Sequence, residues 1–436
     1  MAETNRCSHF YLDFRFVKMI RANMNNDVSP ESKNNSTIRI LFFLGMLVVC
    51  LDVVSIDLGN FKLKISYVWF LVYLIIFAYF FDLKMKITNI VIAGMLMLTF
   101  LPSVIFSSNV LTSVAFYAGT CICLVIMFTF SKMVDVAPSK VIHLLFLFYR
   151  FSVILTALLV LTRVQDRGHF LLYEPSYYAV ALIPYFCLTF HRAFLYGLKI
   201  SALDMFFILM AVVLSQSVSM VLWCFLCFVL TYVSFGHARL MHFVYFCTAV
   251  LFFLIIAYFV DWRTKAIIDG LYGLISDPSG SLSLLVFVVG NRLQRVLVAY
   301  QTFMESPLVG VGLGTIKTYS SNNFIADDFI INGVTAIDFV VESPAANIFV
   351  EVAAEAGLIG FAGFMAVLFF IHRKKNNSTV LAPFKIAFYV TMTALLIDSS
   401  YLRNYVWALY GIVIGISSLE AGRVQNDWFY PSRLRK

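Results

Sequence analysis

The chain has 436 residues, of which 61% are hydrophobic and 13% are charged, and its formal net charge is +8. Soluble domains have about 45–50% apolar and about 25% charged residues, so this composition excludes an ordinary soluble enzyme and indicates a polytopic membrane protein. The positive charge does not indicate a nucleic-acid partner, because most Lys and Arg residues fall in short loops and tails, where they orient membrane helices.

The predicted elements are membrane-spanning helices, which need about 20 mainly apolar residues each. The chain opens with a polar tail over residues 1–37, which lacks the apolar segment and the cleavage site of a signal peptide. About nine spans follow within 38–260 and about three within 346–419, before a polar tail at 420–436. We therefore predict an all-α polytopic membrane protein with about twelve helices. The predicted spans are 38–56, 65–81, 89–107, 109–130, 141–161, 176–191, 200–214, 217–235, 243–260, 346–370, 381–398 and 405–419.

Three polar or proline-containing sites mark boundaries between these spans. Pro138 lies between the fourth and fifth spans and Pro175 between the fifth and sixth, and the residue before a proline is disfavoured in a helix. The turn Ser215-Gln216-Ser217 divides one long apolar run in two. It predicts a hairpin of two helices.

One long interruption separates the ninth and tenth predicted spans. Residues 261–345 form a connection far longer than the usual loop of about 4–6 residues. Loops of that length are commonly functional or disordered, and this one is too apolar and aromatic to be typical of disorder. We therefore expect it to carry the function, on a scaffold of membrane helices.

The distribution of Lys and Arg predicts the orientation of the chain. An even number of spans places both termini on one side of the membrane. Twenty of the 32 basic residues lie on that side, ten on the opposite side, and two, Arg150 and Lys385, within spans. Because positive charge accumulates in cytoplasmic loops, both termini are predicted to be cytoplasmic and the long loop extracytoplasmic. In a bacterial inner membrane the loop would face the periplasm.

Two predicted extracytoplasmic segments concentrate arginine. The first holds Arg163 and Arg167, and the second, in the long loop, holds Arg292 and Arg295. If the second segment is helical, its arginines share a face through their i,i+3 spacing. Paired guanidinium groups suit phosphate or pyrophosphate, because they donate bidentate hydrogen bonds and keep their charge. The alternative is structural: these arginines hold the loop by ion pairs or contact lipid headgroups.

The long loop also contains the glycine-rich stretch Pro307–Gly314. Gly310 and Gly312 allow a close backbone approach to a ligand, although glycines at such spacing mark turns more often than phosphate sites. Downstream, Glu351 and Glu355 lie four residues apart on one predicted helix face. For Glu355 we favour a structural role, in which it pairs with the arginines and holds the loop against the helices.

Few other residues suggest chemistry. Arg150 falls near the middle of the fifth predicted span, where an ionisable side chain is a candidate for function. We expect it instead to form a structural ion pair, with Asp52 or Asp204 as its partner. Cys224 and Cys227 have metal-ligand spacing but lie within an apolar run without a second ligand pair. We predict no metal site and no cofactor.

The order of these motifs resembles the O-antigen ligase/polymerase superfamily. In that family an arginine precedes a Pro-Leu-Leu-Gly-Val-Gly-like stretch by about fifteen residues, and a later helix opens on Asn and continues to Glu-x-Gly-Leu-Ile-Gly. The predicted arrangement of about twelve spans, with one large periplasmic loop between the ninth and tenth, is similar too. The matching segments are Gly290–Arg292, Ser306–Gly314, Asn347–Gly360 and, more loosely, Arg167-Gly168 with Glu174-Pro175-Ser176.

The resemblance implies a GT-C-type glycosyltransferase of the bacterial inner membrane. Ligases of this superfamily have His directly before the Asn at the loop-to-helix junction, and here that position is Ala346, which favours the polymerase branch. Such an enzyme joins O-antigen repeat units, with undecaprenyl-pyrophosphate-linked glycans as donor and acceptor, without a metal. Membrane lipid and a polysaccharide chain-length regulator are the other implied partners. An O-antigen ligase, and a flippase or other transporter of lipid-linked oligosaccharides, are the alternatives.

The predicted site residues follow from this reaction. Positive charge stabilises a departing pyrophosphate, and we expect Arg292 and Arg167 to bind it with help from Arg295 and Arg163. The acceptor hydroxyl needs positioning and a base, for which Glu342, Glu174 and Asp166 are the candidates. The remaining predicted substrate-binding residues are Asn347, Tyr177, Gly310 and Gly312.

Overall fold

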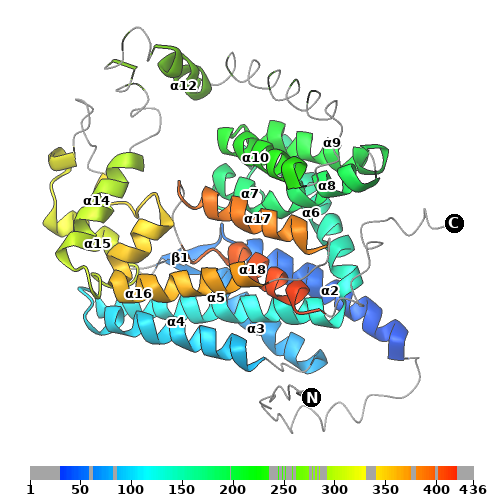
Figure 1. Cartoon of the computed structure of the whole chain (residues 1–436), viewed down its shortest axis with the longest axis horizontal. Coiled ribbons are helices and arrows are strands. Elements are labelled where there is room, and N and C mark those ends of the chain that lie inside the picture. Colours follow the sequence, from blue (N-terminus) through cyan, green and yellow to red (C-terminus); the bar gives the residue numbers. More distant parts are fainter. Residues whose placement is uncertain are drawn as a thin grey trace, which may run out of the picture.

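The structure is a computed structural model. It describes residues 30–57, 62–81, 86–196, 198–234, 262–273, 292–329, 340–374, 380–397 and 401–419, with single residues between 244 and 284. The described chain is helical apart from one two-stranded hairpin and the connections (Figure 1). The helices are α2 (Pro30–Cys50), α3 (Ile65–Phe80), α4 (Ile87–Ile105), α5 (Val110–Val136), α6 (Pro138–Leu161), α7 (Pro175–Ala181), α8 (Ile183–Tyr196), α9 (Leu198–Ser215), α10 (Val218–Ser234), α12 (Trp262–Gly273), α14 (Arg292–Glu305), α15 (Ile316–Asn323), the 3-10 turn η1 (Ala326–Phe329), α16 (Ile348–Arg373), α17 (Leu381–Ala394) and α18 (Asn404–Ser417).

Helix length and apolarity make this an all-α membrane protein. Within the described residues, four helices are long and apolar enough to cross a membrane: α4, α5, the part of α6 from Lys140 to Leu161, and α16. The pair α7 and α8, bent by 44° at Leu182, would make a fifth span. Other apolar helices, among them α3, α9, α10, α17 and α18, are shorter.

The predicted spans coincide with helices wherever the structure describes them. A helix covers most of each span, and the exception, 243–260, lies largely outside the described residues, so the number of about twelve stays a prediction. Pro138 and Pro175 are the first residues of α6 and α7. At that position the backbone nitrogen has no hydrogen-bond partner within the helix, so proline costs no helical hydrogen bond. The predicted hairpin at Gln216, which has φ 45°, joins α9 to α10. The helix α2 begins at Pro30, inside the predicted tail, and the rest of both tails lies outside the described residues.

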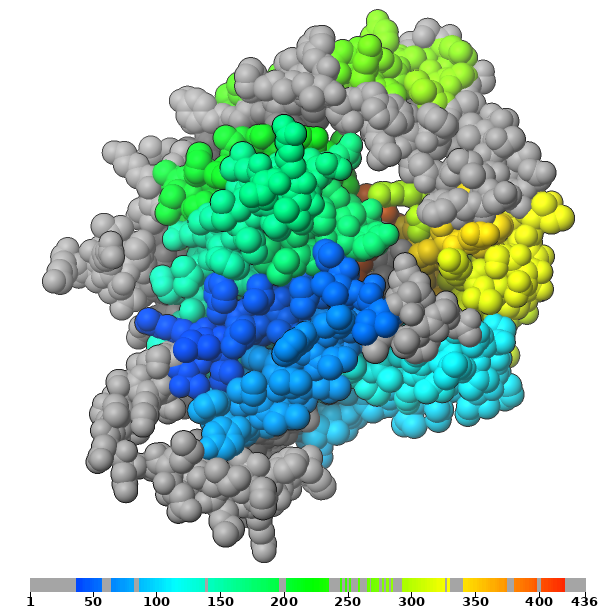
Figure 2. Space-filling view, turned by 180° about the vertical axis from the view of Figure 1, so that it is seen from behind, coloured from blue at the N-terminus to red at the C-terminus, as the bar shows by residue number. Residues whose placement is uncertain are grey.

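The core is built from helices that are distant in sequence. In Figure 1 the helices α4, α5, α16 and α18 lie side by side, and Figure 2 shows from behind that α2 and α3 lie between α4 and the green helices α8 to α10. Gly411 and Gly415, four residues apart on α18, face the backbone of α5 at Met127 and Ser131, where a Cβ would overlap it. Small residues allow such close contact between helix backbones.

Every second connection between helices lies at one end of this bundle, which we call the loop end. The hairpin of β1 (Ser55–Asp57) and β2 (Lys62–Lys64) lies there between α2 and α3. Backbone hydrogen bonds then join connections that are far apart in sequence. They run from Asp52 N to Leu171 O at 2.9 Å, from Gly168 N to Leu214 O at 2.7 Å and from Ser108 N to Val311 O at 3.0 Å.

The segment 261–345, predicted as one long loop, has secondary structure of its own. It contains α12, α14, α15 and η1, and α14 packs against α16 near the loop end (Figure 1). Buried apolar side chains stabilise this secondary structure: Val298 of α14 packs with Phe329 and Val340 in a small separate core. Arg292 and Arg295 both lie on the helix α14, so their i,i+3 spacing places them on one helix face, as expected if this segment were helical.

Candidate functional site

The glycine-rich stretch Pro307–Gly314 lies against a break in α16. Within that helix Gly357 has φ 63° and ψ −172°, a conformation that glycine adopts readily. A break leaves backbone N–H and C=O groups that need other partners, and the stretch supplies them. The bonds are Val311 N to Ala354 O at 3.1 Å, Gly312 N to Glu355 O at 3.0 Å, Leu358 N to Pro307 O at 2.8 Å and Ile359 N to Leu308 O at 3.2 Å.

The two glycines predicted to contact substrate approach the protein's own chain. Gly310 and Gly312 have φ of 73° and 118°. A Cβ on Gly310 would overlap the backbone of Glu355, and one on Gly312 would overlap the side chain of Ser107. The close backbone approach expected from the sequence is therefore present, and its partner is the bundle. Contact of these glycines with substrate stays a prediction.

The N-terminal part of α16 is fixed by side chains that sequence analysis singled out. Asn347 is the N-cap, and its Oδ1 accepts hydrogen bonds from the backbone N–H of Phe349 at 2.9 Å and Val350 at 3.2 Å. Capping uses the oxygen that a substrate contact would otherwise use. Glu351 and Glu355 are both buried on the same helix.

Glu355 holds the long loop, but through groups other than the expected arginines. Its Oε2 accepts a hydrogen bond from Tyr401 Oη at 3.4 Å, and the backbone N–H groups of Gly314 and Ile316 donate to its carboxylate. Burial raises the pKa of Tyr401 well above its usual value, and the charge of Glu355 raises it further, so the hydroxyl stays a donor. The carboxylate therefore joins the loop, α16 and the segment before α18.

The segment between α17 and α18, which we call the α17–α18 connection (residues 395–403), is the centre of the cationic contacts. Two arginines of α14 reach backbone carbonyls near it. Arg292 Nη1 donates to Ile397 O at 3.3 Å, and Arg295 Nε donates to Pro344 O at 2.7 Å, just before α16. These bonds place α14 beside the start of α16 and the residues that follow α17, and Arg292 is partly exposed.

Arg403, at the end of the α17–α18 connection, is a site residue that the sequence analysis missed. Its side chain is buried, its guanidinium carbon lies 3.6 Å from the centre of the Tyr177 ring, and its Nη1 donates to Tyr405 Oη at 3.0 Å. Guanidinium stacking on an aromatic face stabilises the charge by about 2 kcal/mol when the pair is desolvated. The signal in the sequence was a lone arginine on the predicted extracytoplasmic side, where positive charge is disfavoured.

A third cation approaches the same connection from the β-hairpin. Lys64 Nζ forms an ion pair with Asp52 at 2.7 Å and lies 3.4 Å from the carbonyl of Leu402. Both side chains are partly exposed. Lys64, Arg403 and Arg292 thus come from three separate parts of the chain and meet the connection at Leu402, at Arg403 itself and at Ile397.

The remaining predicted residues lie on the neighbouring connection between α6 and α7. Glu174 is the N-cap residue of α7, and its Oε1 accepts a hydrogen bond from Ser176 Oγ at 2.8 Å. Arg163 and Arg167 are exposed, as is Asp166, and Arg163 has φ 57°. Glu342, the other candidate base, is exposed on the segment that leads to α16.

The structure therefore brings some predicted residues together and leaves others apart. Tyr177 and Glu174 lie at the start of α7 beside Arg403, and Arg292 reaches the other side of the α17–α18 connection. Gly310, Gly312 and Asn347 make contacts within the fold. No group of three or more His, Cys, Asp or Glu side chains that could hold a metal occurs among the residues that the structure describes.

The fold and this site define a class: an all-α membrane protein with a cluster of cationic side chains where its connections meet. A scan against models of known protein families finds no match to the chain, and a search of curated proteins finds no similar sequence.

Proposed function

We propose that this protein is an O-antigen polymerase, a membrane glycosyltransferase that joins undecaprenyl-pyrophosphate-linked repeat units at the loop end. The observation that carries the proposal is the convergence of Lys64, Arg292 and Arg403 on the α17–α18 connection. Positive charge is disfavoured on the extracytoplasmic side of membrane proteins, so three cations along one connection, of which Lys64 is already paired with Asp52, support a negatively charged ligand there.

The loop end is, in this proposal, the periplasmic end. The connections predicted to be extracytoplasmic, at residues 57–64, 107–109, 162–175 and 215–217, are those that hydrogen bonds and strand pairing gather there. The arrangement supports an alternation of spans with both termini in the cytoplasm. It also places the structured part of the long loop on the same side as the α17–α18 connection.

The cationic cluster suits the departure of a pyrophosphate. As the glycosidic bond to the donor breaks, negative charge develops on the undecaprenyl pyrophosphate, and cations that are already in place lower the barrier. Arg292 and Arg403 are fixed by hydrogen bonds and stacking, whereas exposed Arg163 and Arg167 are available to a ligand that enters from outside. Glu174, held by Ser176, and exposed Glu342 are the candidates to take the proton of the acceptor hydroxyl.

The test is a gel of lipopolysaccharide from a strain that lacks the gene, complemented by plasmid-borne variants. We expect the deletion to leave core with a single repeat unit, and wild type to restore the ladder. Arg292→Ala should abolish the ladder while the protein still inserts, and Arg292→Lys should restore it poorly, because lysine donates as a point charge. Lys317→Ala removes an exposed cation of the same loop and is the matched control. A full ladder from Arg292→Ala would contradict the assigned role.

A second candidate is a flippase for the same lipid-linked units. Transporters often contain broken helices that line a path through the membrane. Here α16 is broken at Gly357, and α7 and α8 meet at a 44° bend. The same gel separates the candidates: core alone, with single lipid-linked units on the cytoplasmic face, identifies a flippase. Core alone with long polymer on the lipid carrier identifies an O-antigen ligase.

A further inference from the structure

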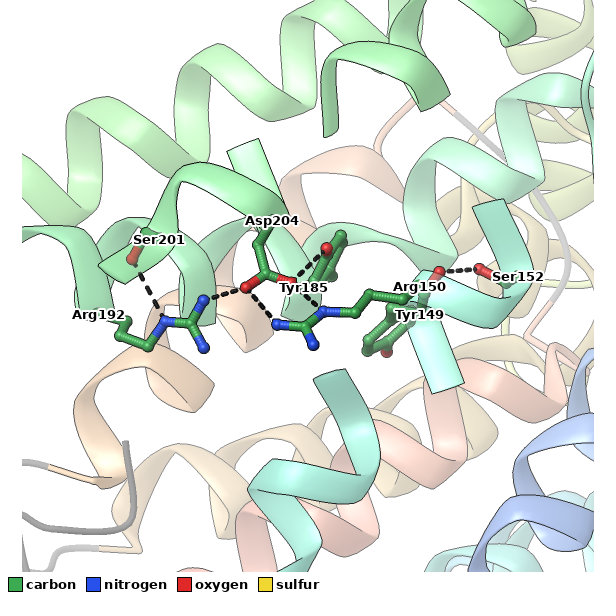
Figure 3. Close-up of polar contacts among 7 residues, drawn as sticks. All are labelled: Tyr149, Arg150, Ser152, Tyr185, Arg192, Ser201 and Asp204. Atoms are coloured by element: carbon green, nitrogen blue, oxygen red, sulfur yellow. Dashed lines mark hydrogen bonds and ion pairs between the residues drawn. The ribbon is translucent and has the colours of Figure 1, made fainter. Parts of the chain in front are cut away.

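A second cluster of charged side chains lies inside the bundle, away from the loop end. Asp204 of α9 is fully buried and accepts hydrogen bonds from four donors on two other helices (Figure 3). The ion pair between Arg150 and Asp204 confirms the pair expected from the sequence, and of the two expected partners, Asp52 and Asp204, it is Asp204 that Arg150 contacts. The bonds to Asp204 are from Arg150 Nε at 2.7 Å, Arg150 Nη2 at 2.8 Å, Tyr185 Oη at 2.7 Å and Arg192 Nη2.

The cluster contains more positive than negative charge. Two arginines face one carboxylate, and Tyr185 contributes a neutral hydroxyl. The side chain of Arg192 is 6% exposed and that of Arg150 is 28% exposed. An unbalanced charge in an apolar surrounding is costly, since burial removes its hydration. Among the described residues Asp204 is the carboxylate that bonds to these arginines, so one positive charge remains to be balanced.

The geometry leaves hydrogen-bond donors directed away from Asp204. Arg150 uses Nε and Nη2 for Asp204, while Arg192 uses Nη2 for Asp204 and Nε for Ser201 at 3.3 Å. In Figure 3 the third nitrogen, Nη1, of each guanidinium points to the same side, away from the carboxylate. Each guanidinium therefore has a donor that does not bond to Asp204, and charged N–H donors of this kind bind phosphate oxygens.

An aromatic ring provides part of the compensation. The guanidinium carbon of Arg192 lies 4.3 Å from the centre of the Phe146 ring, and that of Arg150 lies 6.0 Å from it. A cation–π contact stabilises a charge, most strongly where the pair is desolvated. Removing an ion from water costs more free energy than such a contact returns, so the ring does not replace a counter-ion.

The cluster lies in the half of the bundle opposite the loop end. The backbone carbonyl of Leu214, near the end of α9, bonds to Gly168 at the loop end, so α9 begins at the opposite end. Asp204 lies six residues after Leu198, or about 9 Å along the helix axis. Arg192 is four residues before the end of α8 at Tyr196, or about 6 Å. Arg150 lies twelve residues after Pro138, the first residue of α6, or about 18 Å along that helix axis, so the cluster reaches the middle of the bundle.

We propose that Arg150 and Arg192 form a binding site for a phosphate-bearing anion in the half of the bundle opposite the loop end. The ligand takes hydrogen bonds from the Nη1 groups and balances the remaining positive charge, while Asp204 keeps both arginines in position. The shared chemistry is a phosphate group, either on an anionic phospholipid or free in solution. The proposal does not rest on the glycosyltransferase reaction.

The test measures the melting temperature of the purified full chain in detergent. Three additions are compared: phosphatidylglycerol, inorganic phosphate, and zwitterionic phosphatidylcholine as the reference. We expect phosphatidylglycerol or inorganic phosphate to raise the melting temperature of wild type above the reference, and the active one identifies the source of the phosphate. In Arg150→Gln and Arg192→Gln the affinity should fall about tenfold or more, since each variant loses a charged donor. Lys132→Gln, which removes a cation near the same end from α5, should respond as wild type does.

A variant that removes negative charge, in contrast to the two arginine variants, distinguishes anion binding from a purely structural role of the cluster. Asp204→Asn removes the negative charge between the arginines and leaves two positive charges for the anion. We expect it to lower the melting temperature without ligand and to increase the shift that the active additive causes. A merely structural cluster would lose stability in all three variants with no change in the response to phosphate. Equal shifts in wild type, Arg150→Gln and Asp204→Asn would overturn the proposal.

Discussion

Single residues show how this protein keeps charge inside an apolar chain. Arg403 is stacked on Tyr177 and bonded to Tyr405, and Arg150 is fixed by Asp204. In both places the guanidinium is held by an aromatic ring or a carboxylate, and its planar shape allows stacking and bidentate bonds at once. Lysine has neither property, so arginine and lysine are not interchangeable at these positions.

The Arg403–Tyr177 contact makes a prediction at this scale. Arg403→Lys should reduce the O-antigen ladder strongly, and Tyr177→Ala should do the same, because each removes the stacking that fixes the charge. Tyr177→Phe keeps the ring and should restore most of the ladder. The measurement is the lipopolysaccharide gel, with the amount of membrane-inserted protein checked for each variant. A Tyr177→Ala strain with a normal ladder would show that the contact does not serve the reaction.

Among the elements, α16 is the one whose conformation depends most on the rest of the chain. Its break at Gly357 is stabilised by hydrogen bonds to Pro307–Gly314, and the carboxylate of Glu355 binds that stretch from the other side. The helix and the long loop are therefore one structural unit. The resemblance motifs Ser306–Gly314 and Glu355–Gly360 are the two parts of this unit, which gives a physical reason for their joint presence.

Substitution of Gly357 should disrupt this unit. At Gly357→Ala the Cβ would overlap the backbone of Leu308, and a positive φ is strained for alanine, which together cost about 1–3 kcal/mol or more. We expect a lower melting temperature of the purified protein. Gly94→Ala in α4 is the control, because no atom lies within 4 Å of the added Cβ and alanine favours a helix. Equal melting temperatures for the two variants would mean that the loop does not depend on the break.

At the scale of the whole molecule, the two clusters of charge lie in different parts of one bundle. The cations around the α17–α18 connection are at the loop end, and the Arg150–Asp204–Arg192 cluster lies inside the bundle, in the half opposite the loop end. Apolar helices with exposed Leu, Ile and Val side chains lie between them, as expected for a surface that contacts lipid tails. This separation fits a protein with distinct chemistry at the loop end and inside the bundle.

The orientation of these ends can be measured by cysteine labelling in intact cells. Val164→Cys places a thiol at an exposed position of the loop end, and Arg373→Cys places one at the exposed end of α16 on the opposite side. We expect a membrane-impermeant maleimide to label the first and not the second, because basic residues keep the side of the termini in the cytoplasm. Labelling of wild type gives the background. The reverse pattern would place the loop end in the cytoplasm and exclude a periplasmic polymerase.

The sequence by itself determined the helical class and most helix positions, because runs of apolar residues and prolines at helix starts act locally. It also identified the glycine stretch as a place of close backbone approach and Arg150 as one half of an ion pair. Only the tertiary structure decided the partners: α16 for Gly310, Asp204 for Arg150, and Tyr177 for Arg403. Pairing between residues far apart in the chain depends on how helices pack, and local periodicity carries no information about that packing.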